Sequence, residues 1–339
     1  MGQTVIGFEV QIGSSKFTHN QSNGLLSVIM EDHVDMASVC SVTVSTAENQ
    51  PTQGYKIGDK VSIKIQKSEE LFSGELIAID HAFQGKGSSS VILKCLDHSH
   101  RLARGRQTRF WNDMKDSDVA SEVGSESQLS VEVDATSETH KYILQRNESN
   151  LGFLKRLAAR NNFQLRVEPG KLLFKKADGS AYTYNLSTDT GLISLNMSYN
   201  SADMVQNVVV RGWDITTKKE IVGKASAGDV QNIGGGEGGP QAAGIFGDQT
   251  AYITDVPVST QEMADELAKA EMERIARRFG RGKAVIVGDG HLRAGSTLNI
   301  EKLGEGVNGA HYVISSRHII RPQVGYQTEV TFCSNTMGN

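Results

Sequence analysis

The sequence predicts a mainly β fold with α+β subdomains, in which two similar β-barrels occur in tandem with small α/β domains. Three observations support this prediction. Short apolar segments that alternate with polar residues fill both ends of the chain, separated by glycine-rich and polar turns, as in barrels and sandwiches. A helix and a hairpin interrupt this pattern in the middle. A pattern of glycines and strands from the first hundred residues recurs near the end.

Length and composition set the first bounds. The 339 residues suffice for two to four compact domains. With 35 Lys and Arg against 39 Asp and Glu, the formal net charge is -4, which argues against a protein wrapped around nucleic acid. We expect no membrane partner, because no apolar run approaches the length of a membrane span and the first residues lack a signal-peptide pattern. The three cysteines lie far apart in apolar or alternating runs, so we expect reduced core thiols.

Residues 1–97 are expected to form the first β-barrel. Apolar residues alternate with polar ones in segments bounded by turns, as in half-buried strands. After an opening strand that includes Val10, these segments are SVCSVTVS (38–45), VSIKI (61–65), GELIAIDHAF (74–83) and SSVILKCLDH (89–98).

Residues 98–197 are expected to form an α/β domain around a helix at residues 150–161. The Ser149 hydroxyl is suited to accept from the free amides of the first helical turn. One buried helix face is predicted by apolar residues spaced three and four apart, namely Leu151, Leu154, Leu157 and Ala158. An alternating segment from Phe163, a Glu-Pro-Gly-Lys turn and a return segment predict a hairpin after the helix.

A basic run, RLARGRQTR (101–109), precedes two aromatic residues. We interpret it as a solvated loop between domains, which is the usual role of such a run. The alternative is a wall that faces a negatively charged cargo or partner.

The helix segment also carries a resemblance to a known family. NLGFLKRLA (150–158), after a polar-acidic pair and before the hairpin, resembles the signature region of the late control protein D family. These proteins are the central baseplate hubs of contractile phage tails, and the N-terminal part of VgrG-like spike proteins is similar. A strand that ends Leu-x-x-x-Asp (93–97) fits the same pattern. So does the loop GDGHLRAG (288–295), which is followed by a strand, an Asn-Gly turn, Tyr312-Val313 and a final His318.

The resemblance implies an organisation for the rest of the chain. A return strand at about residues 198–215 would complete the first barrel. The second β-barrel would comprise residues 205–258 and 283–335, and residues 259–281 would hold the helix of a second α/β region. This helix is expected to be capped by Ser259 or Thr260 and to end before Gly280.

A glycine-rich stretch, residues 234–239, precedes this helix. Its composition predicts an irregular, mobile loop that buries little surface.

An internal repeat supports two related barrels. Gly58 opens a strand, a glycine turn and a second strand that reaches His81. Gly295 opens the same succession, which reaches His318 at the same separation. We therefore expect the two strand pairs to share one topology.

No chemical motif points to catalysis, so we assign no catalytic, cofactor-binding or metal-binding residue and expect no cofactor. The G-x-G-x-x-G match at residues 304–309 precedes a strand rather than a helix, so it is expected to be a hairpin loop. His98 and His100 would share a face if they lie on a strand, but no third ligand stands at a suitable spacing. Motifs of serine hydrolases and zinc proteases are absent from the sequence.

The resemblance implies a structural central hub of a contractile tail or injection-system baseplate. A homotrimer would present six similar barrels to a hexameric inner tail tube and would join it to a threefold spike protein. Its other partners would be baseplate proteins and, in the lumen, cargo or DNA. The expected location is the bacterial cytoplasm during assembly and then the virion or extracellular particle. The resemblance does not distinguish a phage from a bacteriocin or an extracellular injection system.

An all-β carbohydrate-binding or hydrolase module of a phage is the alternative. Such a module needs paired carboxylates in a cleft and exposed aromatic side chains. Aromatic residues make up only 6% of the chain, which is few for sugar stacking.

Overall fold

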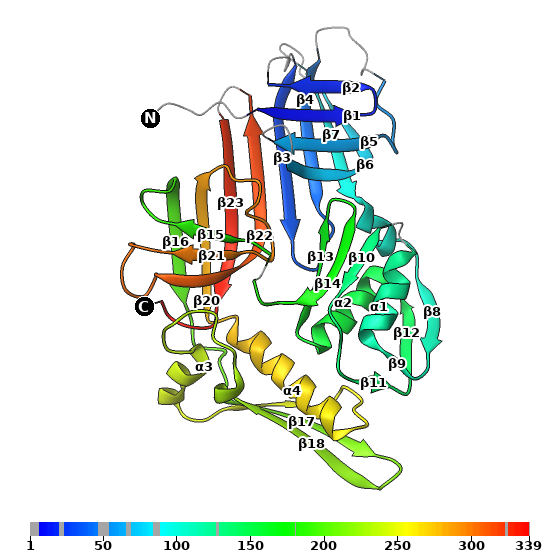
Figure 1. The fold of residues 1–339 in the computed structure, drawn as a ribbon, viewed down its shortest axis with the longest axis vertical. Coiled ribbons are helices and arrows are strands. Elements are labelled where there is room, and N and C mark those ends of the chain that lie inside the picture. The colour runs from blue at the N-terminus through cyan, green and yellow to red at the C-terminus, as the bar shows by residue number, and fades with distance from the viewer. Residues whose placement is uncertain are drawn as a thin grey trace.

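The computed structural model describes residues 7–19, 24–46, 54–65, 69–83, 89–126, 129–179, 181–322 and 325–338. Most of these residues lie in strands, as the sequence predicts. Figure 1 shows two strand-rich units side by side, with two regions that contain the helices below them. No helix in the described part of the chain is long and apolar enough to span a membrane.

In the described residues, the first β unit comprises β1 (Phe8–Ile12), β2 (Ser15–Thr18), β3 (Leu25–His33), β4 (Val39–Thr46), β5 (Lys60–Ile65), β6 (Glu69–Ala82) and β7 (Ser89–Asp97). Alternate residues in β1, β4, β5 and β7 are buried, which is the pattern read from the sequence. Their apolar side chains form one core. Cys40 and Cys95 are register partners within it, and both are free thiols.

The second β unit contains β15 (Thr183–Leu186), β16 (Leu192–Tyr199), β20 (Gly280–Val287), β21 (Thr297–Ile300), β22 (Gly309–Arg321) and β23 (Gly325–Ser334). These strands enclose a separate core that includes Leu298, Val313 and Phe332. The loop at residues 304–309 connects β21 to β22, and three of its glycines have positive φ. The G-x-G-x-x-G match is therefore a hairpin loop, as predicted.

The two β units share one continuous sheet. Its strand order is β16-β20-β23-β22-β3-β4-β7-β6-β5-β1-β2, and β21 and β15 extend from β22. In Figure 1, the strands from β16 to β7 run roughly vertically, and the other strands cross in front of them. The units meet where β22 pairs with β3 in antiparallel fashion, a contact we name the junction.

The first α/β region follows β7. It comprises η1 (His98–Ala103), β8 (Gln107–Trp111), β9 (Met114–Lys115), α1 (Asp116–Ser125), β10 (Ser130–Val133), β11 (Thr139–His140), β12 (Ile143–Glu148), α2 (Asn150–Arg160), β13 (Phe163–Glu168) and β14 (Lys171–Lys176). As predicted, Ser149 Oγ accepts from Gly152 N at the start of α2, at 3.1 Å. Leu154 and Leu157 are fully buried in the core of this region.

The second α/β region differs from the prediction. It comprises β17 (Asn207–Asp214), β18 (Lys219–Ser226), η2 (Ala227–Asp229), α3 (Gly239–Ala242), η3 (Ala243–Phe246), β19 (Thr250–Ile253) and α4 (Gln261–Ala276). Residues 198–215 do not complete the first β unit, and residues 205–258 do not belong to the second. Instead β17, β18 and β19 form their own sheet, which packs against α4. Alternation reveals a half-buried strand but not its partner, and this explains the error.

Helix α4 begins as predicted but ends earlier than predicted. Thr260 Oγ1 accepts from Met263 N at 3.1 Å, so Thr260 is the cap. The helix ends at Ala276, and Gly280 is already the first residue of β20.

The glycine-rich stretch is packed rather than loose, contrary to the prediction. Ile233 N donates to Asn335 Oδ1 at 2.9 Å, and Gly239 N donates to Asn335 O at 2.9 Å. A Cβ atom added at Gly239 would lie 2.3 Å from the Phe279 ring, and one added at Gly236 would lie 2.2 Å from Met337 O. Glycine is needed here because the chain passes close to its own C-terminal segment.

Candidate functional site

The two β units are duplicates of one another at the level of strand register. In the first unit, Lys60 pairs with Glu75, and in the second unit Thr297 pairs with Tyr312. Every further pair between β5 and β6, down to Ile63, has a counterpart between β21 and β22 at the spacing that separates Gly58 from Gly295. The pairs between β6 and β7 match those between β22 and β23 in the same way. The repeat predicted from the sequence is therefore confirmed.

The turns that open the repeats are also equivalent. Gly58 N donates to Leu76 O at 2.8 Å, and Gly295 N donates to Val313 O at 2.8 Å. Leu76 N and Val313 N donate in return to the carbonyl oxygen of the residue after each glycine, both at 2.9 Å. Both glycines have positive φ, which favours glycine at this turn.

Irregularities recur at matching places. The β6–β7 ladder shifts register between Leu76 and Ala78, and the β22–β23 ladder shifts between Val313 and Ser315. The β3–β4 ladder shifts at the start of β3, and β16–β20 shifts at the start of β16. Bulges are specific features of a sheet, so their repetition indicates that β3 corresponds to β16, β4 to β20, and β5–β7 to β21–β23.

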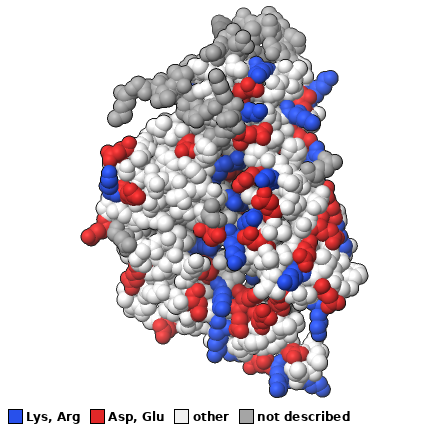
Figure 2. Space-filling model, viewed as in Figure 1, with Lys and Arg blue, Asp and Glu red and all other residues white. Residues whose placement is uncertain are grey.

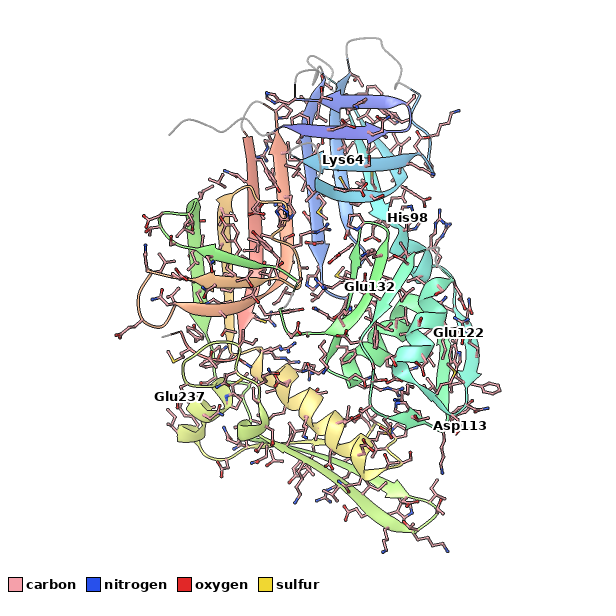
Figure 3. All side chains as sticks on the ribbon, viewed as in Figure 1. Lys64, His98, Asp113, Glu122, Glu132 and Glu237 are labelled. Atoms are coloured by element: carbon pink, nitrogen blue, oxygen red, sulfur yellow. The ribbon has the colours of Figure 1, made fainter. Side chains whose placement is uncertain are left out.

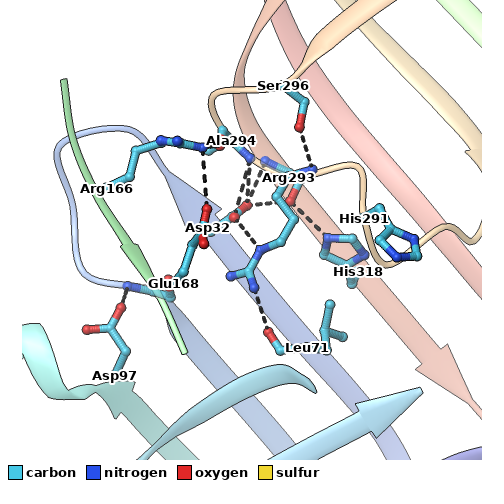
Figure 4. A network of polar contacts seen from close by, with 12 residues as sticks. Asp32, Leu71, Asp97, Arg166, Glu168, His291, Arg293, Ala294, Ser296 and His318 are labelled. Carbon is cyan, nitrogen blue, oxygen red and sulfur yellow. Dashed lines mark hydrogen bonds and ion pairs between the residues drawn. The ribbon is translucent and has the colours of Figure 1, made fainter. Parts of the chain in front are cut away.

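The junction holds a buried polar network centred on Asp32 of β3 (Figure 4). Arg293 Nε lies 2.9 Å from Asp32 Oδ2, and Arg293 Nη1 donates to Leu71 O at 3.1 Å. Ser316 of β22 donates to Asp32 through both its amide, at 3.2 Å, and its hydroxyl. Ala294 N lies 3.3 Å from the same carboxylate. Because its oxygens are all engaged, Asp32 fastens β22 and the loop before β21 to the first unit.

His318 extends this network along β22. Its Nε2 lies 2.9 Å from Ser316 Oγ, and its Nδ1 lies 2.8 Å from Tyr326 Oη and 3.3 Å from Thr328 Oγ1. Burial lowers the pKa of His318 to about 4, although the Asp32 carboxylate acts in the opposite direction. The imidazole is therefore neutral at pH 7.

The charge on Asp32 is retained inside the protein. Burial on its own would raise the pKa of this carboxyl, but Arg293, His318 and the Ser316 hydroxyl outweigh it, and the pKa lies below its usual value. A buried ion pair of this kind holds its two partners in one arrangement, because separating them would leave a charge buried and unpaired.

The junction is also tied to the first α/β region. Leu165 N of β13 donates to Asp35 Oδ1 at 2.8 Å, and Asp35 N donates to Leu165 O at 2.7 Å. Arg166 Nη1 lies 3.3 Å from Ala294 O. A pocket opens here, lined by Asp32, His33, Ser38, Arg166, Val167, Glu168, Arg293 and Ala294. The charged side chains that line the pocket already contact one another, so the pocket serves to hold these parts of the chain together.

The histidines singled out in the sequence do not form a metal site. They do not lie on one strand, because η1 begins at His98 (Figure 3) and takes His100 off β7. His100 Nε2 instead lies 3.0 Å from Glu75 Oε2. Asp97 caps η1, accepting from Ser99 N at 2.8 Å. Across the described ranges, no group of three or more His, Cys, Asp or Glu side chains is placed to hold a metal ion.

The basic run is not a bare solvated loop either. Arg101 pairs with Glu75, and Arg109 contacts Glu126 and donates to Gln145 Oε1 at 2.8 Å. Figure 2 shows both signs of charge mixed on this face of the molecule, with few charges over the second β unit. Mixed signs give no extended positive surface on this face, which disfavours a wall that faces a negatively charged cargo or partner there.

Sequence reasoning missed Asp32 and only partly indicated Arg293. Arg293 lies in the GDGHLRAG loop that carried part of the resemblance, and His318 closed the same pattern. Asp32 had no signal beyond being an acidic residue in an apolar strand. Its role depends on a strand almost three hundred residues away, which local sequence patterns do not specify.

Comparisons with known proteins show the family to which this chain belongs. The family model described as the Alg8 N-terminal domain matches residues 17–322. The chain belongs to the Alg8 N-terminal domain family. No curated protein sequence matches the chain.

Solved structures resemble this member of the Alg8 N-terminal domain family over nearly its whole length. The 43 kDa tail protein of prophage MuSo2 from Shewanella oneidensis aligns with a TM-score of 0.74 and 12% identity, over 96% of this chain and 98% of that one. A tail protein from Neisseria meningitidis MC58 aligns with a TM-score of 0.72 and 10% identity, over 98% and 97%.

A secretion protein shares the fold as well. The E. coli c3393 protein is described as a type VI secretion component similar to the T4 tail proteins gp27 and gp5. It aligns with a TM-score of 0.65 and 10% identity, over 97% of this chain and 78% of that one. Identities this low show a common fold, and that fold is the one implied by the resemblance in the sequence.

Proposed function

We propose that the chain is the structural central hub of a contractile tail or injection-system baseplate. The observation that carries the proposal is the residue-by-residue duplication of the β unit within one chain. A duplicated unit lets a particle with threefold symmetry present six similar surfaces to a sixfold partner. The fold shared with phage tail proteins and with a type VI secretion component supports the same function.

In this proposal three copies close into a ring. The six β units contact a hexameric inner tail-tube protein on one face, and a threefold spike protein contacts the other. The α/β regions brace the ring, and other baseplate proteins attach around it. Two contacts between these regions support a rigid brace: Thr260 Oγ1 donates to Glu138 Oε1 at 2.9 Å, and Arg277 Nη2 donates to Ala177 O at 2.7 Å.

The role is structural rather than enzymatic, and the lumen of the ring passes cargo or DNA. The chain would be made in the bacterial cytoplasm and would then become part of the virion or extracellular particle.

Light scattering coupled to size exclusion tests this proposal on the full chain. The expected mass is three times that of one chain, and mixing with an inner tube protein should give complexes with three hub chains for six tube subunits. Electron microscopy of the assembled particle should place the chain between tube and spike. A chain that stays monomeric at all concentrations and binds no tube protein would contradict the proposal.

A further inference from the structure

Several strands of the continuous sheet have an open edge among the described residues, including β2 and β15. Two of these open edges matter for the duplication. One is β16, which pairs with β20 on one side only. The other is the C-terminal half of β6. Its first half pairs with β5 and its second half with β7, so residues 78–83 leave one edge without a strand. Open edges that carry apolar side chains are templates for pairing with another chain.

Each open edge corresponds to a strand that is paired inside the chain. By the register of the duplication, β6 is the counterpart of β22, and β16 is the counterpart of β3. The pair β22–β3 forms the junction. These two open strands, β6 and β16, are therefore the counterparts of the two strands that join the units.

The exposure of side chains at these edges agrees with this correspondence. Ile320 of β22 is 4% exposed, because it enters the core of the first unit, whereas its counterpart Phe83 is 80% exposed. His318 is fully buried, and its counterpart His81 is exposed and stacks on Phe83 with a ring separation of 6.1 Å. An exposed aromatic pair in positions that are buried at the junction indicates a missing neighbour.

We propose that β6 of one chain pairs antiparallel with β16 of a second copy of this chain, in the register of the junction. The junction pairs run from Ser315 with His33 to Ile320 with Val28. The corresponding pairs between copies are Ala78 with Asn200, Ile79 with Tyr199, Asp80 with Ser198, His81 with Met197, Ala82 with Asn196 and Phe83 with Leu195. This inference rests on the proposed function and names the surfaces that close its ring.

The chemistry of this contact differs from that of the junction. The buried Ser316–Asp32 pair of the junction has Ile79 and Tyr199 as its counterparts, and Arg293 corresponds to the exposed Lys56. The contact between copies would therefore bury apolar side chains and main-chain hydrogen bonds, without a buried ion pair like that of Asp32 and Arg293. Such a contact joins chains that fold separately, since neither side leaves a buried charge unpaired before assembly.

The proposed contact is of the kind from which closed rings are built. A strand on one side of the chain meets a different strand on the next chain, which is a head-to-tail contact. Head-to-tail contacts give a closed ring when each step repeats the same rotation and the rotations complete a turn. If the contact between copies repeats the junction, all neighbouring β units in the ring are related alike.

Engineered disulfides test the register. Paired residues on antiparallel strands have Cα atoms about 4.5–5.5 Å apart, within the range that a disulfide bridges. In the Asp80→Cys, Ser198→Cys double variant, mild oxidation should join chains into covalent dimers and trimers on a non-reducing gel. In the Asp80→Cys, Asn196→Cys variant, which is displaced by two residues, we expect at least tenfold less of these products.

A matched control lies inside the chain. Glu31 and Arg317 are register partners at the junction and occupy the corresponding positions, with Arg317 Nε 2.8 Å from Glu31 Oε1. The Glu31→Cys, Arg317→Cys variant should oxidise fully without any increase in mass. If this control oxidises and light scattering shows a ring, but Asp80→Cys, Ser198→Cys gives no covalent oligomer, the proposed contact is wrong and the hub function stands.

Other outcomes separate the two proposals further. Covalent oligomers that close at a number other than three would support the β6–β16 contact and contradict the trimeric hub. A monomer at all concentrations, without covalent products, would contradict both.

A second variant tests the contact without a disulfide. Phe83→Asp should weaken ring formation at least tenfold and leave the melting temperature of the dilute single chain unchanged, because Phe83 is exposed there. A ring of unchanged affinity would overturn the proposed contact.

Discussion

At the scale of single residues, buried polar groups determine how the chain responds to pH. His318 is neutral in the folded protein, with a pKa of about 4, but in the unfolded chain it titrates near its usual value of 6.5. Between these values the unfolded state binds more protons, so the free energy of unfolding falls as the pH falls from 6.5 towards 4. The buried Asp32 responds only at lower pH, because its pKa lies below the usual 3.8.

We expect the wild-type chain to lose about 2 kcal/mol of stability from this histidine between pH 7 and pH 5. In His318→Gln, which keeps a polar side chain but does not titrate here, that part of the pH dependence should disappear. Urea unfolding at the two pH values measures both. Equal pH dependence in the two proteins would show that His318 titrates normally.

The apolar face of α2 gives a second prediction at this scale. Leu154→Asp or Leu157→Asp should abolish soluble expression, because a buried unpaired carboxylate costs several kcal/mol, which is on the order of the stability of a domain. Lys155→Ala on the other face should be close to neutral. Thermal melts measure this, and equal melts for the three variants would contradict the assignment of the faces.

At the scale of elements, the sequence predicted the strands and helices better than their partners. Helix α2, its Ser149 cap and the hairpin after it follow from spacing, because a local pattern determines a local structure. The sheet membership of β17 was predicted wrongly, because alternation of Val208 and Val210 with polar residues is compatible with any half-buried sheet. The junction network could not be predicted from the sequence for the same reason, because Asp32 and Arg293 meet only through tertiary pairing.

Composition alone predicted the wrong structure for the glycine-rich stretch. Glycines there indicate close packing and not mobility, since Gly236 and Gly239 leave no room for a side chain. Deleting residues 234–239 should therefore lower the melting temperature by several degrees or make the chain insoluble. As a control, Gly244→Ala replaces a nearby glycine that has open space around it and should leave the melt unchanged. An unaltered melt after the deletion would show that these contacts contribute little.

At the scale of the whole molecule, the junction makes one body of two β units. Its ion pair is buried, so removing one partner leaves the other charge without compensation. Arg293→Ala should destabilise the chain by roughly 3–5 kcal/mol. Lys56→Ala, at the corresponding position of the first unit, should be nearly neutral because Lys56 is exposed. Denaturant unfolding of both variants measures the difference, and similar losses would contradict a special role for the junction.

The pairing of β22 with β3 also has a consequence during synthesis. Strand β3 leaves the ribosome early, but β22 begins only at Gly309, so β3 waits for most of the chain to be made. At about 5–20 residues per second this wait is on the order of half a minute. During that time β6 of another nascent chain, the counterpart of β22, can occupy the place intended for it. Neighbouring chains on one messenger can therefore mispair during this wait, and faster elongation or wider spacing of ribosomes should favour the correctly closed monomer.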